Sequence, residues 1–129
     1  MSGETNLDSL LANMRPELGS SSFAFCLVPK VKLSEISLDD IEVWVRESEG
    51  ITLVMKEAQA RRYGFDVTHL FARITLQVHS SLTAVGLTAV VATRLAAQGI
   101  SANVIAGYHH DHIYVAQSDG QRAVEILQA

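Results

Sequence analysis

The densest group of side chains able to do chemistry is the run His109-His110-Asp111-His112. Imidazole and carboxylate groups are ligands for divalent metals, and histidine is also a common general acid or base. Successive strand residues point to opposite faces, so one cation could collect these side chains only at a tight turn. Three interpretations stay open: a metal site, a polar hairpin lip beside a ligand site, or a solvated turn. We adopt the hairpin lip and expect no bound metal.

A second polar group is the turn Ser80-Ser81-Leu82-Thr83, which comes directly before a helical pattern. The first N–H groups of a helix are unpaired and carry partial positive charge, so a carboxylate can bind there. Ser81 or Thr83 is expected to cap this helix as well. Gly86 falls in the expected first turn, where it permits close approach of a ligand or simply close packing.

Hydrophobic periodicity predicts the elements that must position these residues. Residues 73–79 alternate as a strand with Ile74, Leu76 and Val78 on one face. A helix ending at Gly99 follows, and its apolar stripe comprises Ala84, Leu87, Val91 and Leu95. Residues 101–108 and 112–117 are two further strands, and Asp119 is expected to cap a last helix. This order is the front part of a ferredoxin-like β-α-β-β-α unit, with its helices on one face of the sheet.

The first half of the chain shows a weaker version of the same plan. A helix is expected over 7–13, capped by Asn6 or Asp8, and a buried strand over 23–28, with the residues from 16 to 22 breaking the pattern between them. Residues 41–46 and 51–55 form a predicted hairpin, followed by a helix over 56–63 that ends at Gly64. Neither half shows a closing strand. We therefore expect the open sheet edge to be covered by the other half, by the N-terminal segment or by a second subunit.

Composition excludes several classes of function. With 129 residues, 48% apolar and 19% charged, the chain can form a real core. A net charge of −4, with no basic cluster beyond Arg61-Arg62, disfavours a nucleic-acid partner. The single cysteine, Cys26, lies in an apolar run and predicts a buried thiol in a reducing, cytoplasmic setting. We expect no secretory signal and no membrane association. Trp44, exposed on the predicted hairpin, is expected on a face that packs between halves or subunits.

Residues 85–101, continued by the strand 103–108, resemble an ACT domain, as in the regulatory domains of aspartokinases. The run from Tyr108 to Val115 is similar to the strand pair of small bacterial proteins built from two ACT-like halves. The resemblance implies an α+β, ferredoxin-like (βαββαβ) fold. It divides the chain into a degenerate N-terminal half, residues 1–65, and a C-terminal half, residues 66–129.

The resemblance also implies a binding or sensing module without catalytic residues or a cofactor. Its ligand, an amino acid, would bind where the strand-to-helix turn of one unit meets a neighbouring strand. The residues expected around such a ligand are His79, Ser80, Ser81, Leu82, Thr83, Val85, Gly86, Asn103, Ile105, Tyr108, His109 and Asp111. A homo-oligomer and a regulated partner protein are implied too. The alternatives are a ligand-free interaction module and an enzyme with His79 or His109 as general base; the chain has no G-x-S-x-G, phosphate loop or C-x-x-C motif.

Overall fold

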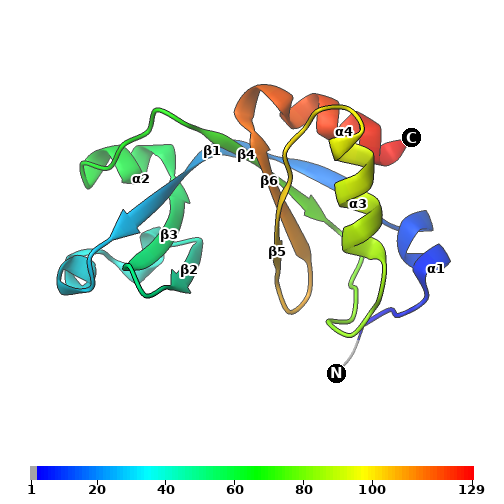
Figure 1. Ribbon diagram of the computed structural model, residues 1–129, viewed down its shortest axis with the longest axis horizontal. Helices are drawn as coiled ribbons and strands as arrows, with labels where there is room; N and C mark the ends of the chain where they lie inside the picture. Colours follow the sequence, from blue (N-terminus) through cyan, green and yellow to red (C-terminus); the bar gives the residue numbers. More distant parts are fainter. Residues whose placement is uncertain (1–2) are drawn as a thin grey trace. The chain divides into compact units, whose positions relative to one another are not determined.

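The computed structural model describes residues 3–129, apart from the side chains of residues 30 and 31. It contains two compact units (Figure 1): Met1–Ser20 with Ala72–Ala129, here called the larger unit, and Ser21–Phe71, the smaller unit. No helix in the described part of the chain combines the length and hydrophobicity that a membrane-spanning segment requires.

The larger unit is a β-α-β-β-α arrangement completed by a strand from the N-terminal part of the chain. Its elements are α1 (Leu7–Ala12), the start of β1 (Pro16–Val28), β4 (Phe71–Leu76), α3 (Leu87–Ala96), β5 (Asn103–Ala106), β6 (Asp111–Ala116), η3 (Gln117–Asp119) and α4 (Gly120–Gln128). The strand order is β1-β4-β6-β5. The first residues of β1 thus take the place of the missing closing strand. Of the three segments that we expected to pair with the open sheet edge, the structure shows the N-terminal one.

The smaller unit repeats the plan with one element changed. It contains the rest of β1, η1 (Lys30–Glu35), η2 (Leu38–Asp40), β2 (Val43–Arg46), β3 (Ile51–Lys56) and α2 (Glu57–Arg62). The strand order is β2-β3-β1, and both pairings are antiparallel. Two short 3-10 helices stand where the larger unit has α3. The hairpin turn from Glu47 to Gly50 is as predicted. The helix α2 ends at Arg62, and Gly64 follows its C-cap with a positive φ of 81°, the place expected for this glycine.

The core of the larger unit lies between one face of its sheet and the helices. Ala72, Ile74 and Leu76 alternate with more exposed residues along β4, as the predicted strand requires. From α3, the side chains of Leu87, Val91 and Leu95 are buried against this face, together with residues of α1 and α4. Several residues of α3 are β-branched and weaken its intrinsic helicity, so this packing stabilises the helix. The predicted stripe is confirmed from Leu87 onward.

Two local predictions are wrong. The residues from Pro16 to Ser22 do not interrupt the chain, because β1 runs through them from Pro16 to Val28. Proline is tolerated as the first residue of a strand, and pairing with β4 compensates for the weak β-propensity of the Gly-Ser run. At Gly19 a side chain would approach the Arg73 carbonyl oxygen to 3.3 Å, so the two strands are close there. At the last helix, Asp119 occupies the N-cap position but its side chain makes no capping hydrogen bond.

Candidate ligand-binding site

The loop between β4 and α3 is held by the N-terminal segment. The Glu4 N–H donates to the His79 carbonyl at 2.8 Å, and the Ser81 N–H donates to the Glu4 carbonyl at 2.9 Å. Ser80 and Ser81 are buried as a result, with exposed fractions of 8% and 6%. The Glu4 carboxylate accepts from the N–H groups of Asn6 and Thr5, which lowers its pKa and fixes the turn that leads into α1. The loop is therefore anchored on residues remote from it in the sequence.

The helix after this loop begins later than predicted. Its N-cap is Gly86, with φ at 110° and no side-chain cap, so the expectation that Ser81 or Thr83 caps the helix is wrong. Instead, the Ser81 hydroxyl accepts from the Thr83 N–H at 3.2 Å and closes a turn inside the loop. The physical reason is that the loop pairs with Glu4, which draws it away from helical geometry. The first N–H groups of α3 are consequently not covered by a capping side chain.

A cavity of about 140 Å³ lies beside this helix start. The first turn of α3 forms one side, and the end of β5 and the start of β6 form the other. The residues that line it are Ser80, Ser81, Leu82, Ala84, Gly86, Leu87, Thr88, Ala106 and Asp111. The Ser80 hydroxyl donates to Oδ2 of Asp111 at 3.0 Å, which fixes the carboxylate at the edge of the cavity. The partial positive charge of the helix start and the negative charge of Asp111 thus lie at the same hollow.

The structure brings together only part of the expected set of residues. Ser80, Ser81, Leu82, Gly86 and Asp111 line the cavity. The expected residues that do not line it are His79, Thr83, Val85, Asn103, Ile105, Tyr108 and His109. The amide nitrogen of Asn103 donates to the carbonyl of Tyr114 at 3.2 Å, across the β5–β6 pair.

Four lining residues were absent from the sequence-based set: Ala84, Leu87, Thr88 and Ala106. Leu87 and Thr88 would have followed from a helix start placed at Gly86. Ala106 is the register partner of Asp111, so a correct hairpin register would have identified it.

The histidines near this loop spread apart. His109 and His110 lie in the turn between β5 and β6, which the Gly107 N–H closes on the His110 carbonyl at 2.9 Å. His112 Nδ1 lies 2.9 Å from the Thr75 hydroxyl. The ring of His109 instead packs edge-on against His79, with 5.0 Å between centroids. No group of three or more His, Cys, Asp or Glu side chains among residues 3–129 is placed to hold a metal ion.

Residues 2–72 and residues 72–129 each match a family model described as an ACT domain. The chain belongs to the ACT domain family. Among curated proteins, none matches this ACT protein significantly. The predictions of the family, of two tandem halves and of an α+β, ferredoxin-like fold are confirmed. The boundary expected between residues 65 and 66 stays a prediction.

Solved structures resemble the ACT protein over most of its length. A Vibrio cholerae protein of unknown function, described as a possible transport protein, is 47% identical, with a TM-score of 0.79 and coverage of 94% of this chain and 92% of that one. The ligand-free regulatory subunit of aspartate kinase from Thermus thermophilus is 11% identical, with a TM-score of 0.57 and coverage of 88% and 94%. A structure of aspartokinase alpha and beta subunits is 8% identical, with a TM-score of 0.64 and coverage of 88% and 94%. The last two show the fold alone. Family and fold together support a regulatory module that binds a small molecule.

Proposed function

We propose that this ACT protein binds a small amino acid in the cavity between the start of α3 and Asp111. The observation that carries the proposal is the presence of opposite charges at one small hollow: a helix start without a side-chain cap and a fixed carboxylate. A zwitterion carries the complementary pair, an ammonium and a carboxylate. We propose a binding role rather than catalysis, and a cytoplasmic setting.

The size of the hollow favours a small ligand. Its volume of about 140 Å³ is below the ~300–1,000 Å³ typical of pockets for drug-sized molecules. In the proposed pose, the ligand carboxylate accepts from the N–H groups at Leu87 and Thr88 and from the Thr88 hydroxyl. The ammonium donates to Asp111. Leu82, Ala84 and Ala106 leave room only for a short apolar side chain.

A test is a thermal-shift and calorimetry panel of L-amino acids on the full chain. A ligand at about 100 times its Kd adds ~2.7 kcal/mol to the unfolding free energy, which gives a clear rise in Tm. Thr88→Val and Asp111→Asn are expected to weaken the binding of the best amino acid at least tenfold. Thr93→Val is the matched control, since Thr93 is an exposed residue of the same helix outside the cavity. No shift with any amino acid would favour the ligand-free interaction module.

For the homo-oligomer, the edge strand β2 supports a specific arrangement. β2 pairs with β3 on one side only and carries the half-exposed Trp44. If two copies pair antiparallel about Trp44, Arg46 of one faces Glu42 of the other. Opposite charges across strands contribute about 0.2–1 kcal/mol each. Light scattering after size exclusion tests this: Arg46→Glu should shift the protein toward monomer, and Glu42→Arg added to it should restore the dimer. An unchanged mass for all three proteins would refute this interface.

A regulated partner protein must contact a surface of the ACT protein that changes when the amino acid binds. Three large hydrophobic side chains around the loop and the β5–β6 turn are exposed: Leu82, Val85 and Tyr108, at 48%, 84% and 58%. We propose that a regulated partner contacts this rim, because ligand binding beneath Leu82 would change its position. A Val85→Asp variant should then lose the partner while still binding the amino acid, and loss of both would contradict this separation.

A further inference from the structure

The smaller unit contains a second hollow, of about 250 Å³, at the place where its connection departs from the plan of the larger unit. It lies between the end of β1, η1 and the residues that follow α2. Its floor is apolar: Val28 and Ile36 are buried and Phe65 is half-buried. Two short 3-10 helices stand here in place of the ten-residue α3 of the other unit, and the hollow lies beside the first of them.

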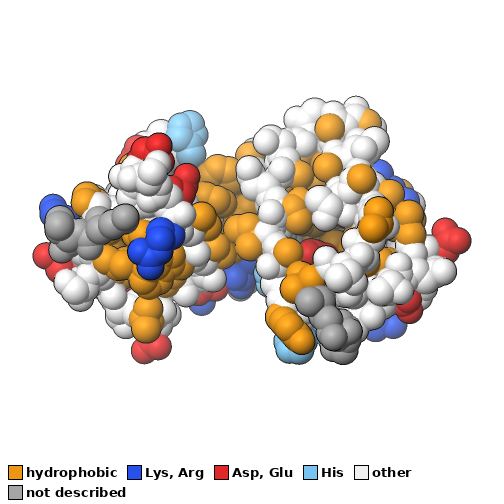
Figure 2. All heavy atoms as spheres, turned by 60° about the horizontal axis from the view of Figure 1, so that its bottom comes forward, with side chains coloured by type: hydrophobic (Ala, Val, Ile, Leu, Met, Phe, Trp, Pro, Cys, Tyr) orange, Lys and Arg blue, Asp and Glu red, His pale blue; other side chains and the backbone are white. Residues whose placement is uncertain are grey.

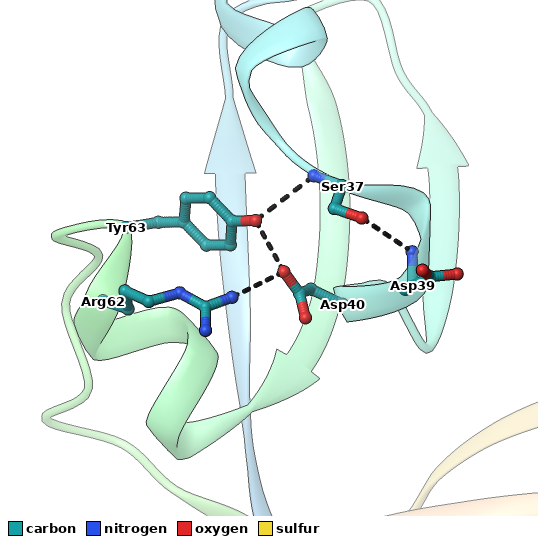
Figure 3. A network of polar contacts seen from close by, with 5 residues as sticks. All are labelled: Ser37, Asp39, Asp40, Arg62 and Tyr63. Carbon is teal, nitrogen blue, oxygen red and sulfur yellow. Dashed lines mark hydrogen bonds and ion pairs between the residues drawn. The ribbon is translucent and has the colours of Figure 1, made fainter.

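One wall of this hollow is fixed by a polar network (Figure 3). The Tyr63 hydroxyl donates to Oδ2 of Asp40 at 2.6 Å and accepts from the Ser37 N–H at 3.2 Å. Arg62 forms an ion pair with the same carboxylate at 2.7 Å. These contacts connect the end of α2 to η2 and to Ser37 just before it, so the ring of Tyr63 is held beside the hollow before any ligand binds. A preformed wall lowers the entropy cost of binding.

The rim carries one positive and one negative side chain at a spacing that suits a zwitterion. Lys32 and Glu35 are exposed, line the hollow and are three residues apart in η1. Residues at i and i+3 eclipse in a 3-10 helix, so both lie on one side. In the described part of the chain, neither side chain forms an ion pair or a hydrogen bond. Figure 2 shows the wider setting: on the smaller unit, an apolar surface is bordered by basic and acidic side chains.

We infer that this hollow is a second binding site, for an amino acid with a branched or extended apolar side chain. Lys32 binds the carboxylate, Glu35 binds the ammonium, and the alkyl chain rests on Val28, Ile36 and Phe65. A nucleotide, a phosphate or a fatty acid has no cationic group for Glu35 and would bring its own negative charge close to that carboxylate. The greater volume distinguishes this site from the smaller cavity beside Asp111. The inference is independent of the proposed function and stands if that site binds nothing.

The test is NMR titration of the 15N-labelled full chain with L-leucine and two probes that each lack one charge, 4-methylpentanoate and 3-methylbutylamine. L-leucine is expected to shift the amide signals of Ile36, Gly64 and Phe65. Each one-charge probe should bind at least tenfold more weakly. Asp111→Asn should leave these shifts unchanged, because Asp111 lines the other cavity. Binding at the two sites can therefore be measured separately.

Charge exchange on the rim gives the decisive comparison. Lys32→Glu and Glu35→Lys are each expected to weaken L-leucine binding at least tenfold, and the double variant should recover most of it because the i and i+3 positions share one side. Both side chains are exposed, so the fold should persist, as the NMR spectra will show. Equal binding of L-leucine and 4-methylpentanoate, shifts confined to the larger unit, or no binding up to the solubility limit of L-leucine would each overturn the inference. So would a folded double variant that binds no better than the single ones.

Discussion

Gly86→Ala tests how the loop and the start of α3 are positioned. The residue has φ at 110°, and an added Cβ would lie 3.0 Å from Cδ2 of Leu7 in α1. A side chain held in such a backbone conformation costs about 1–3 kcal/mol. Overpacking costs typically 1–3 kcal/mol, with the low end expected here because Leu7 is partly exposed and its terminal methyl can shift. The sum is roughly 2–4 kcal/mol of unfolding free energy.

The matched control is Gly99→Ala, beyond the other end of α3. Gly99 also has a positive φ, 74°, but an added Cβ there would have no atom within 4 Å. This variant should show the backbone strain alone, about 1–2 kcal/mol. For a chain of this length, each kcal/mol lowers Tm by roughly 3–5 °C. Gly86→Ala should therefore melt several degrees below Gly99→Ala by calorimetry.

A third variant isolates the contact itself. In a Leu7→Ala background the added methyl at residue 86 has no terminal methyl to displace, so its cost should fall by about 1 kcal/mol, to that of the control. The double-mutant cycle would be measured by urea unfolding. Two results would refute this reasoning: an equal loss of unfolding free energy in Gly86→Ala and Gly99→Ala, or an unchanged loss for Gly86→Ala in the Leu7→Ala background. Either would mean that Leu7 of α1 does not pack against the start of α3.

Three further predictions concern the hydrogen bond between Tyr63 and Asp40 and the buried side chains of Cys26 and Leu95. Tyr63→Phe removes the hydrogen bond to the Asp40 carboxylate and should lower the unfolding free energy in urea by about 1.5–3 kcal/mol, the range for a bond to a charged group. Burial raises the pKa of the Cys26 thiol to about 11, so the folded state keeps its proton where the unfolded chain has lost it. Stability should therefore fall by about 2–3 kcal/mol as the pH rises from ~9 toward 11, and Cys26→Ala should remove that part of the slope. Leu95→Ala, at a fully buried position, should cost about 2–5 kcal/mol by urea unfolding, whereas the 84%-exposed Val85 should tolerate alanine within about 0.5 kcal/mol.

Periodicity predicted the elements whose pattern is local. The alternation along β4 and the stripe of α3 are visible in short windows, because one face of each is buried. The hairpin between β2 and β3 is visible for another reason, since β2 is mostly exposed: its apolar residues flank a turn that ends at Gly50. The extent of β1 was not predictable in this way. Its Gly-Ser run has weak β-propensity, and the strand exists there because β4, distant in sequence, pairs with it.

The candidate site shows the same limit. The turn at Ser80 and the carboxylate of Asp111 were identified from residue types and from the family resemblance. The start of α3 was placed too early, because the contacts of Glu4 and Leu7 that decide it come from the other end of the chain. Ala106 was missed because its place depends on the register of β5 against β6, which a single sequence specifies poorly.

The two halves differ most in the segment that connects their first strand to their second, which runs from β4 to β5 in the larger unit and from β1 to β2 in the smaller unit. In the larger unit, the segment after the first strand has apolar residues at helical spacing, so it forms α3 and packs over the sheet, and a small cavity lies at the helix start. In the smaller unit, the corresponding residues lack that period and form 3-10 turns, whose hydrogen bonds are poorer and whose length is limited. The volume left open lies over the core rather than at a helix start, and its rim carries Lys32 and Glu35. One plan thus gives two hollows with different walls, and a ligand that fits one by size should fit the other poorly.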